Sequence, residues 1–265
     1  MRRASAGLSP VRAGALLAML VAAAAVYGVA NSSAFTLRDL RVEGAAYTDP
    51  GAVEHALAAV RGKNLFGLRT GPVEAALLEL PTVRGADIAV QLPGSLQVRL
   101  QERSAILVWR VGARRYLVDV DGRLFARVGD EPPAEAAALP VVEDRRATSA
   151  GLSIGGQLEA VDLDAATRLA SLLPADVGSE ATGLTVAVGD ANGFVVRAHP
   201  QDWSAVFGFY TLSLRTPDLI PGQVRLLRSL LIGREPLLER MILASETDGT
   251  FIVRPTPRPS ATPAP

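Results

Sequence analysis

The stretch between Arg12 and Arg38 contains no charged residue, and it constrains the chain more than any other feature. Its centre, residues 14–30, is almost wholly apolar, and uncharged residues flank it on both sides. A helix of about 20 residues crosses a hydrocarbon core about 30 Å thick. We therefore expect a transmembrane helix over residues 13–33.

The first twelve residues carry three arginines and no acidic side chain. The positive-inside rule places such a flank in the cytoplasm, so residues 1–12 are expected to be a cytoplasmic stub and the remainder to lie outside. A cleaved signal peptide is the alternative, because Gly28-Val29-Ala30 and Ser32-Ser33-Ala34 offer small-residue cleavage sites. The apolar run exceeds the ~7–15 residues of a signal peptide, which favours the anchor.

Composition excludes several classes of function. With 27 basic and 27 acidic residues the chain has no net charge, so it shows no basic footprint for nucleic acid. The absence of cysteine excludes disulfides, cysteine-ligated zinc and a thiol nucleophile. About 220 residues follow the anchor, enough for one or two small domains.

The first segment after the anchor predicts the order strand, helix, helix, strand, strand. Leu40 and Val42 alternate with charged residues, which indicates a strand, and Asp49-Pro50 is typical of a capped helix start. Such a unit packs two helices on one face of a three-stranded sheet, an α+β arrangement. The expected elements are strands over 35–44, 86–91 and 96–101, and helices over 50–60 and 70–80.

Several short motifs recur in order along this unit. They are Val42-Glu43-Gly44, Asn64-Leu65-Phe66, Leu80-Pro81-x-Val83-x-x-Ala86, Leu92-Pro93 and Glu102-Arg103. In this order, directly after a single anchor, residues 35–103 resemble the POTRA domain of the FtsQ/DivIB cell-division proteins. We expect Leu65 and Phe66 to pack together beneath the sheet.

Residues 104–254 predict a mixed, mainly antiparallel β domain with flanking helices. Trp109, the Asp121-Gly122 hairpin, Gly208, Gln223 and the Asp248-Gly249 turn also resemble the FtsQ family. One departure is Ile242-Leu243-Ala244, where family members often carry Asp-Leu-Arg. The expected elements are strands over 106–110, 116–120, 184–188, 194–198, 203–210, 240–244 and 250–253, and helices over 164–173 and 223–232.

The segments between these elements predict loops. Residues 131–137 and the glycine-rich residues 149–156 are expected to be connections, the latter lacking the lysine of a phosphate loop. Glu143-Asp144-Arg145-Arg146 has balanced charges and is typical of a solvated face. Residues 255–265 predict a disordered or polyproline-like tail.

No residue is expected to be catalytic, to bind a cofactor or to ligate a metal. The chain has two histidines, His55 on a helix rim and His199 in a loop, and no G-x-S-x-G elbow. Gly94-Ser95 and Gly178-Ser179 are expected in ordinary turns. Asp119-x-Asp121-Gly122 lacks the remaining ligands of a calcium loop, and a hairpin explains it equally well.

Binding through a sheet edge is the remaining hypothesis. The last expected strand, Thr250, Phe251, Ile252 and Val253, precedes a tail rather than another strand, so it is expected at an edge that can accept a partner strand. Phe251 and Val253 would face one way and the other two residues the opposite way. The alternative is that these side chains complete the core.

The resemblance implies a non-enzymatic, single-pass scaffold of the bacterial division machinery at the septum, with partners of the FtsL and FtsB type. It implies no nucleic-acid partner and no small-molecule substrate. One alternative is a POTRA-containing outer-membrane assembly or secretion factor, which would need more POTRA repeats and a long barrel. Another is an exported hydrolase, which would need an activated nucleophile.

Overall fold

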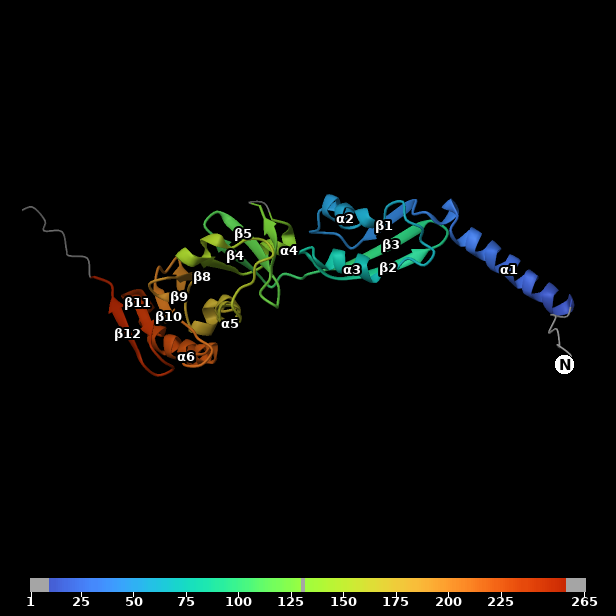
Figure 1. Cartoon of the computed structure of the whole chain (residues 1–265). Coiled ribbons are helices and arrows are strands. Elements are labelled where there is room, and N and C mark those ends of the chain that lie inside the picture. The colour runs from blue at the N-terminus through green and yellow to red at the C-terminus, as the bar shows by residue number, and fades with distance from the viewer. Residues whose placement is uncertain (1–9, 130–131, 256–265) are drawn as a thin grey trace, which may run out of the picture. The chain divides into compact units, whose positions relative to one another are not determined.

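The computed structural model describes residues 10–129 and 132–255. These divide into two compact units, the first ending at Glu102 and the second beginning at Arg103. The first unit opens with helix α1 (Pro10–Ala30), none of whose residues is buried (Figure 1). Among the described residues it is the one helix long and apolar enough to cross a membrane, with a mean hydropathy of 2.1. It begins three residues before the expected span, and Asn31 Nδ2 donates to Tyr27 O at its end.

The rest of the first unit has the predicted α+β order, which confirms the fold class. The central strand is β3, with β1 parallel to it on one side and β2 antiparallel on the other. Asp49 caps the first helix, its Oδ2 accepting from Ala52 N at 3.1 Å. The elements are β1 (Asp39–Glu43), α2 (Pro50–Ala56), α3 (Gly71–Leu78), β2 (Val83–Gln91) and β3 (Ser95–Glu102).

The core of this unit lies between the two helices and one face of the sheet. Leu57, Leu77, Leu96 and Val98 are almost completely buried there. Leu65 joins them as expected, but the expectation for Phe66 is wrong, because its side chain is 52% exposed. Adjacent residues in an extended segment point to opposite sides, so the loop can bury one of this pair and must expose the other.

Glu102 ties the end of β3 to the segment that leads into α2. Its carboxylate accepts hydrogen bonds from the backbone N–H groups of Ala46, Tyr47 and Thr48, at 2.7–3.0 Å, and from Thr48 Oγ1. Burial raises the pKa of Glu102, but these hydrogen bonds outweigh it and hold the pKa below its usual value.

The second unit contains a nine-stranded sheet in the order β12-β11-β10-β9-β8-β7-β4-β5-β6 within residues 103–129 and 132–255. Three neighbouring pairs, β4–β7, β7–β8 and β10–β11, are parallel and the others antiparallel, as the expected mixed, mainly antiparallel domain requires. The strands are β4 (Leu107–Val111), β5 (Arg114–Val118), β6 (Leu124–Val128), β7 (Val141–Asp144), β8 (Gly183–Gly189), β9 (Gly193–His199), β10 (Ser204–Gly208), β11 (Leu238–Leu243) and β12 (Gly249–Val253).

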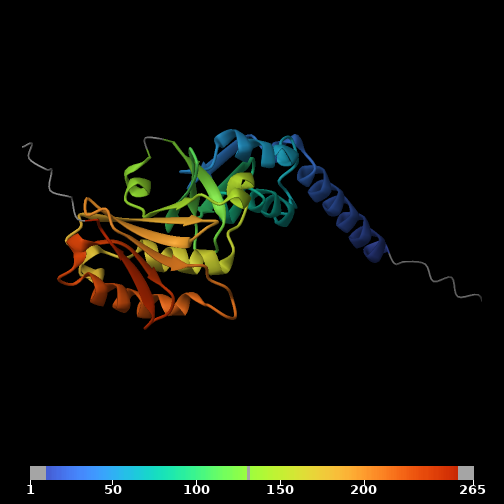
Figure 2. The ribbon, with the colours of Figure 1, turned by 90° about the vertical axis from the view of Figure 1, so that its left-hand side faces the viewer.

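Two helices, α5 (Ala160–Ala170) and α6 (Ile220–Leu231), lie on one face of this sheet (Figure 2). The first connects the parallel strands β7 and β8, and the second connects β10 and β11. Both connections step in the same direction across the sheet, so right-handed crossovers place both helices on the same side. The core fills the space between them, and its largest buried side chains include Trp109, Trp203, Phe194 and Phe207.

Several loop expectations in this unit are wrong. Of the expected loop over 131–137, residue 131 lies outside the described residues, and the part that is described contains a short helix, α4 (Ala134–Ala137). The glycine-rich connection begins in a 3-10 turn, Ala147–Gly151, where Ser149 is buried. The hairpin at Asp121-Gly122 is longer than two residues, because Asp119 Oδ1 accepts from Asp121 N and Arg123 N.

We predict that Glu102→Gln loosens the segment between β1 and α2. Gln keeps one oxygen acceptor but loses the charge, so the local stability should fall by about 1–3 kcal/mol at neutral pH. Because the folded-state pKa is lowered, this contribution is complete above the unfolded pKa of about 4.3 and is lost as the pH falls through the folded value.

Hydrogen–deuterium exchange of a peptide covering Ala46, Tyr47 and Thr48 measures this effect. The exposed Glu79→Gln, at the end of α3, is the matched control and should leave that peptide unchanged. Equal exchange in the two variants at neutral pH would contradict the role assigned to Glu102.

Candidate partner-binding edge

The predicted binding residues Thr250, Phe251, Ile252 and Val253 all lie in β12, the strand at one end of the nine-stranded sheet. Among the described residues its one strand partner is β11, to which it pairs antiparallel. None of the four side chains is buried, and those of Phe251 and Val253 are 47% and 55% exposed. The structure therefore gathers these residues on an exposed strand.

The backbone N–H and C=O groups of β12 point alternately toward β11 and toward open solvent. Arg254 N donates to Leu237 O at 2.8 Å, which points the backbone of residue 254 toward the chain leading into β11. Backbone groups of successive strand residues point to opposite sides. The bulge in this pair adds its extra residue to β11, so the alternation along β12 is not interrupted. The N–H and C=O groups of Phe251 and Val253 therefore point away from the sheet.

The register sets which face each side chain occupies. Phe251 lies opposite Met241, and Val253 lies opposite Leu238. Met241 and Leu238 are buried on the face that the helices cover. Ile252 lies opposite Arg240, on the face away from α5 and α6. A strand added beside β12 would thus contact apolar side chains on both faces.

The opposite edge of the sheet is paired with a returning segment where β6 begins. At β6, Leu124 N donates to Gly156 O at 2.9 Å, and Gly155 N donates to Leu124 O at 2.8 Å. A bridge between Arg123 and Gln157 continues this pairing. An uncovered edge strand exposes unpaired backbone groups that can pair with another chain. Among the described residues, β12 has no such pairing on its outer side.

Buried polar side chains fix the strands behind β12. Gln223, fully buried in α6, donates from Nε2 to Phe207 O and Leu243 O and accepts from Tyr210 Oη at 2.7 Å. Arg215 Nη2 donates to the same two carbonyl oxygens, at 2.8 and 2.9 Å. Burial raises the pKa of the Tyr210 phenol, which keeps it protonated as a donor. The ends of β10 and β11 are thereby held together.

A turn then returns the chain from β11 into β12. Ser245 Oγ accepts from Thr247 N and Asp248 N, at 3.2 and 2.9 Å. A Cβ atom on Gly249 would lie 2.9 Å from Ile242 O, so glycine is needed where β12 begins. The Asp248-Gly249 turn that the sequence predicts is therefore required by close backbone approach.

Glu235 braces the start of β11. Its carboxylate accepts from Trp203 Nε1 at 2.7 Å, from Glu180 N at 2.9 Å and from Ser179 Oγ. Burial raises the pKa of Glu235, but the hydrogen bonds from Glu180, Ser179 and Trp203 outweigh this effect and hold the pKa below its usual value. Ser179 thus has a structural partner beyond an ordinary turn.

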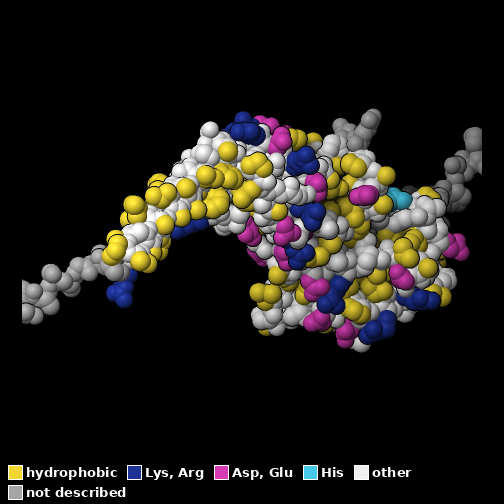
Figure 3. Space-filling view, turned by 90° about the vertical axis from the view of Figure 1, so that its right-hand side faces the viewer, with side chains coloured by type: hydrophobic (Ala, Val, Ile, Leu, Met, Phe, Trp, Pro, Cys, Tyr) yellow, Lys and Arg dark blue, Asp and Glu magenta, His cyan; other side chains and the backbone are white. Residues whose placement is uncertain are grey.

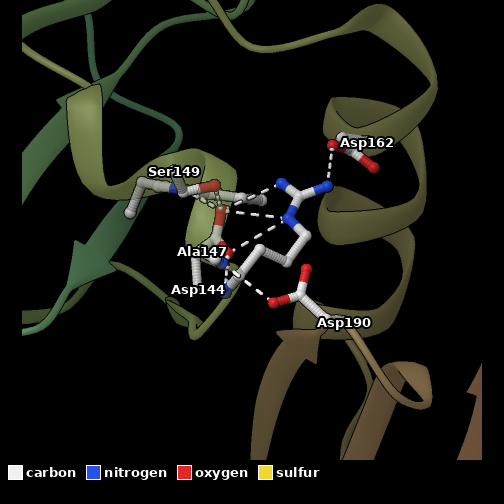
Figure 4. Close-up of polar contacts among 7 residues, drawn as sticks. Asp144, Ala147, Ser149, Asp162 and Asp190 are labelled. Atoms are coloured by element: carbon white, nitrogen blue, oxygen red, sulfur yellow. Dashed lines mark hydrogen bonds and ion pairs between the residues drawn. The ribbon is translucent and has the colours of Figure 1, made fainter.

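The charged run over residues 143–146 is a solvated face only in part, because Glu143 and Arg145 are accessible but Asp144 is not, which corrects the sequence interpretation. Asp144 is buried, and its carboxylate accepts from Trp109 Nε1 at 3.1 Å, Ser149 Oγ at 2.6 Å and the Arg146 side chain (Figure 4). Arg146 also pairs with Asp162 on α5, at 2.6 Å. Burial raises the pKa of Asp144, but its bonds to Arg146 and Ser149 outweigh that effect and lower it.

The face of the sheet opposite α5 and α6 holds a cavity of about 700 Å³ beside α4. Its charged and titratable lining residues are Arg110, Arg115, Glu143, Arg145, Arg197 and His199. His199 ends β9 rather than lying in a loop, and its Nε2 lies 3.1 Å from Thr185 Oγ1. Within the described residues, no cluster of three or more acidic or histidine side chains could hold a metal ion.

Comparison with known proteins identifies the first unit. Residues 35–103 match the family model for the POTRA domain of the FtsQ type. The cell division protein FtsQ of Chloroflexus aurantiacus is 30% identical over 168 residues, 61% of this chain and 57% of that protein. That of Chloroflexus aggregans is 29% identical over 180 residues, 67% and 63% of the two chains. That of Agrobacterium fabrum is 28% identical over 128 residues, 48% and 39%.

An apolar helix followed by a POTRA domain and a large mixed sheet defines a POTRA-containing protein with one candidate membrane span. Residues 35–103 are a POTRA domain of the FtsQ type, and a large part of the chain is similar to FtsQ cell-division proteins, which confirms the resemblance carried by its motifs. It spans less than two thirds of the length of the relatives that it matches.

We predict that Asp144→Ala destabilises the second unit by about 3–5 kcal/mol, because it leaves buried donors of Trp109, Arg146 and Ser149 without their acceptor. The adjacent Glu143→Ala is the matched control and should cost less than about 1 kcal/mol, because its ion pairs are partly exposed. Urea unfolding followed by tryptophan fluorescence measures both, since Trp109 and Trp203 lie in this unit. Similar midpoints for the two variants would contradict the buried network.

Proposed function

We propose that the chain is a non-enzymatic, membrane-anchored scaffold of the bacterial division machinery, and that it binds a partner strand along β12. The observation that carries the proposal is the free outer edge of β12 in a chain related to the FtsQ proteins. Strand addition at such an edge gains affinity from backbone hydrogen bonds and specificity from alternate side chains.

Anchoring supports this role. Helix α1 is long enough to span the hydrocarbon core, and the basic residues before it favour a cytoplasmic N-terminus. The POTRA unit and the sheet would then lie outside the cytoplasm. Tethering two proteins to one membrane confines them to a thin layer and raises their effective concentration for one another. A modest edge interaction is then sufficient for stable assembly.

The proposed partners are single-pass division proteins of the FtsL and FtsB type. Each would offer an extended segment beside its own anchor, and this segment would pair with the outward backbone groups of Phe251 and Val253. Phe251 lies on the helix-covered face and Ile252 on the other, so the incoming strand needs apolar side chains at alternating positions on both faces. Localisation of the complex to the division septum follows from these partners.

We predict that Phe251→Pro abolishes partner binding with little change in fold. Proline removes the N–H group that points outward and is tolerated on an edge strand when that N–H faces solvent. Co-purification of the full-length chain with its membrane partners from detergent extracts measures the effect. Phe251→Ala keeps the N–H and should retain part of the binding.

Ile252→Pro provides the contrasting control. Its N–H points toward β11, so proline there should disrupt the hairpin and lower the unfolding midpoint of the second unit. Undiminished co-purification of partners by Phe251→Pro would refute strand addition at β12. A diffuse rather than septal fluorescent fusion of the unaltered chain would refute the division role itself.

A further inference from the structure

The end of the POTRA unit that adjoins α1 is assembled from loops distant in sequence. Asn64 Nδ2 donates to Ala30 O, the last residue of α1, at 2.6 Å. In the same loop Leu65 N donates to Phe35 O at 2.7 Å, and Leu37 N donates to Lys63 O at 3.2 Å. The loop after α2 is thus joined both to the helix end and to the segment that follows it.

The sheet topology brings a third segment to this end. Strands β1 and β3 are parallel, so both begin here, and Gly94 O accepts from Arg38 N and Asp39 N at 2.8 and 3.1 Å. The turn that contains Leu92 therefore lies beside the start of β1. Residues 35–38, 61–70 and 91–94 together form what we call the α1-proximal end.

Apolar side chains are exposed at the α1-proximal end. Phe66 is 52% exposed and Leu92 is 50% exposed. The ring centroid of Phe66 lies 5.6 Å from that of Phe35, and these two rings border a shallow hollow with Val26 and Val29 of α1. In Figure 3 the hydrophobic side chains along α1 are followed by further hydrophobic side chains on the adjoining surface. The apolar surface of the span thus continues onto the POTRA unit.

Basic side chains outnumber acidic ones at this end, where Asp39 follows Arg38 at the start of β1. The three segments contain Arg38, Arg61, Lys63 and Arg69 and no acidic residue. Arg61 forms an ion pair with Glu54 on α2 at 2.8 Å, with both side chains more than half exposed. Lys63 is the only lysine in the chain. Aromatic and apolar groups ringed by basic side chains match the boundary between acyl chains and anionic headgroups.

We propose that the α1-proximal end is a lipid-contacting surface, on which Phe66 and Leu92 enter the headgroup boundary of an anionic phospholipid bilayer. Arg38, Lys63 and Arg69 then lie at the level of the phosphates and bind them. The proposal rests on the proposed function only in that α1 spans the membrane. It adds a second attachment that limits how far the POTRA unit can tilt from its anchor.

The opposite end of the POTRA unit provides the matched comparison. Leu78 is 40% exposed at the end of α3. The next strand, β2, begins opposite Glu102, and Thr82 just before it forms a hydrogen bond with Thr48. This end carries acidic residues such as Glu102 and Asp49. Leu78 thus has an exposure similar to that of Leu92 but lies at the end of the unit away from α1.

Brominated-lipid quenching tests the proposal on the full-length chain in nanodiscs of phosphatidylcholine and phosphatidylglycerol. The variants are Phe66→Trp and Leu92→Trp, with Leu78→Trp as the control and Val21→Trp as a reporter inside α1. The native tryptophans are buried in the second unit and give a constant background. Bromine near the headgroup should quench the tryptophan fluorescence of Phe66→Trp and Leu92→Trp roughly twofold more strongly than that of Leu78→Trp.

The outcomes separate the inference from the proposed function. If Val21→Trp is quenched but Phe66→Trp is quenched no more than Leu78→Trp, the lipid-contacting surface is overturned while the anchor stands. Loss of quenching in Val21→Trp as well would overturn the anchor and the surface together. If Phe66→Trp is not quenched by bromine because a second copy of the chain covers this residue, the lipid-contacting surface is also overturned.

Removing phosphatidylglycerol tests the basic residues. Without anionic lipid, quenching of Phe66→Trp should weaken while that of Val21→Trp stays unchanged. The same weakening should follow in anionic discs when Arg38→Gln, Lys63→Gln and Arg69→Gln are combined with Phe66→Trp. Quenching that is insensitive to both changes would overturn the phosphate contact.

Discussion

An open sheet must end in two edge strands, and the way the second unit treats its two edges determines much of what it can do. At β6 a returning segment pairs with the first residue of the strand through Gly155 and Gly156, so the start of that edge is covered. At β12 the described chain supplies no such cover, and the outward backbone groups of Phe251 and Val253 remain available. Strand addition therefore follows from an asymmetry of backbone pairing rather than from any reactive side chain.

The position of that edge depends on buried polar groups. Gln223 and Arg215 hold the ends of β10 and β11, Glu235 braces the start of β11, and Asp144 fixes the middle of the sheet against α5. Gln223, Glu235 and Asp144 each have several hydrogen-bond partners, so removing one of these side chains leaves several buried groups unpaired.

Local patterns predicted much of this architecture. Alternation gave most of the strands but not β6 and β7, and helical spacing gave α2, α3, α5 and α6. The ordered motifs around Asn64, Pro81 and Glu102 indicated the FtsQ-type POTRA domain. Boundaries were less accurate, since α6 starts three residues before the expected Gln223 and the connection after β5 is organised by Asp119. These errors arise because helix starts and turn lengths depend on side-chain caps that periodicity does not encode.

The sequence by itself determined the apolar helix, the order of elements in the first unit and the resemblance of that unit to FtsQ-type POTRA domains, because each depends on neighbours within a few residues. Only the tertiary structure decided that Asp144 is buried, that Phe66 is exposed beside the end of α1, and that one sheet edge is covered while the other is free. The reason is physical: burial and edge pairing depend on residues far apart in the chain. Asp144 meets Trp109, and Leu124 meets Gly156, only once the strands between them have paired.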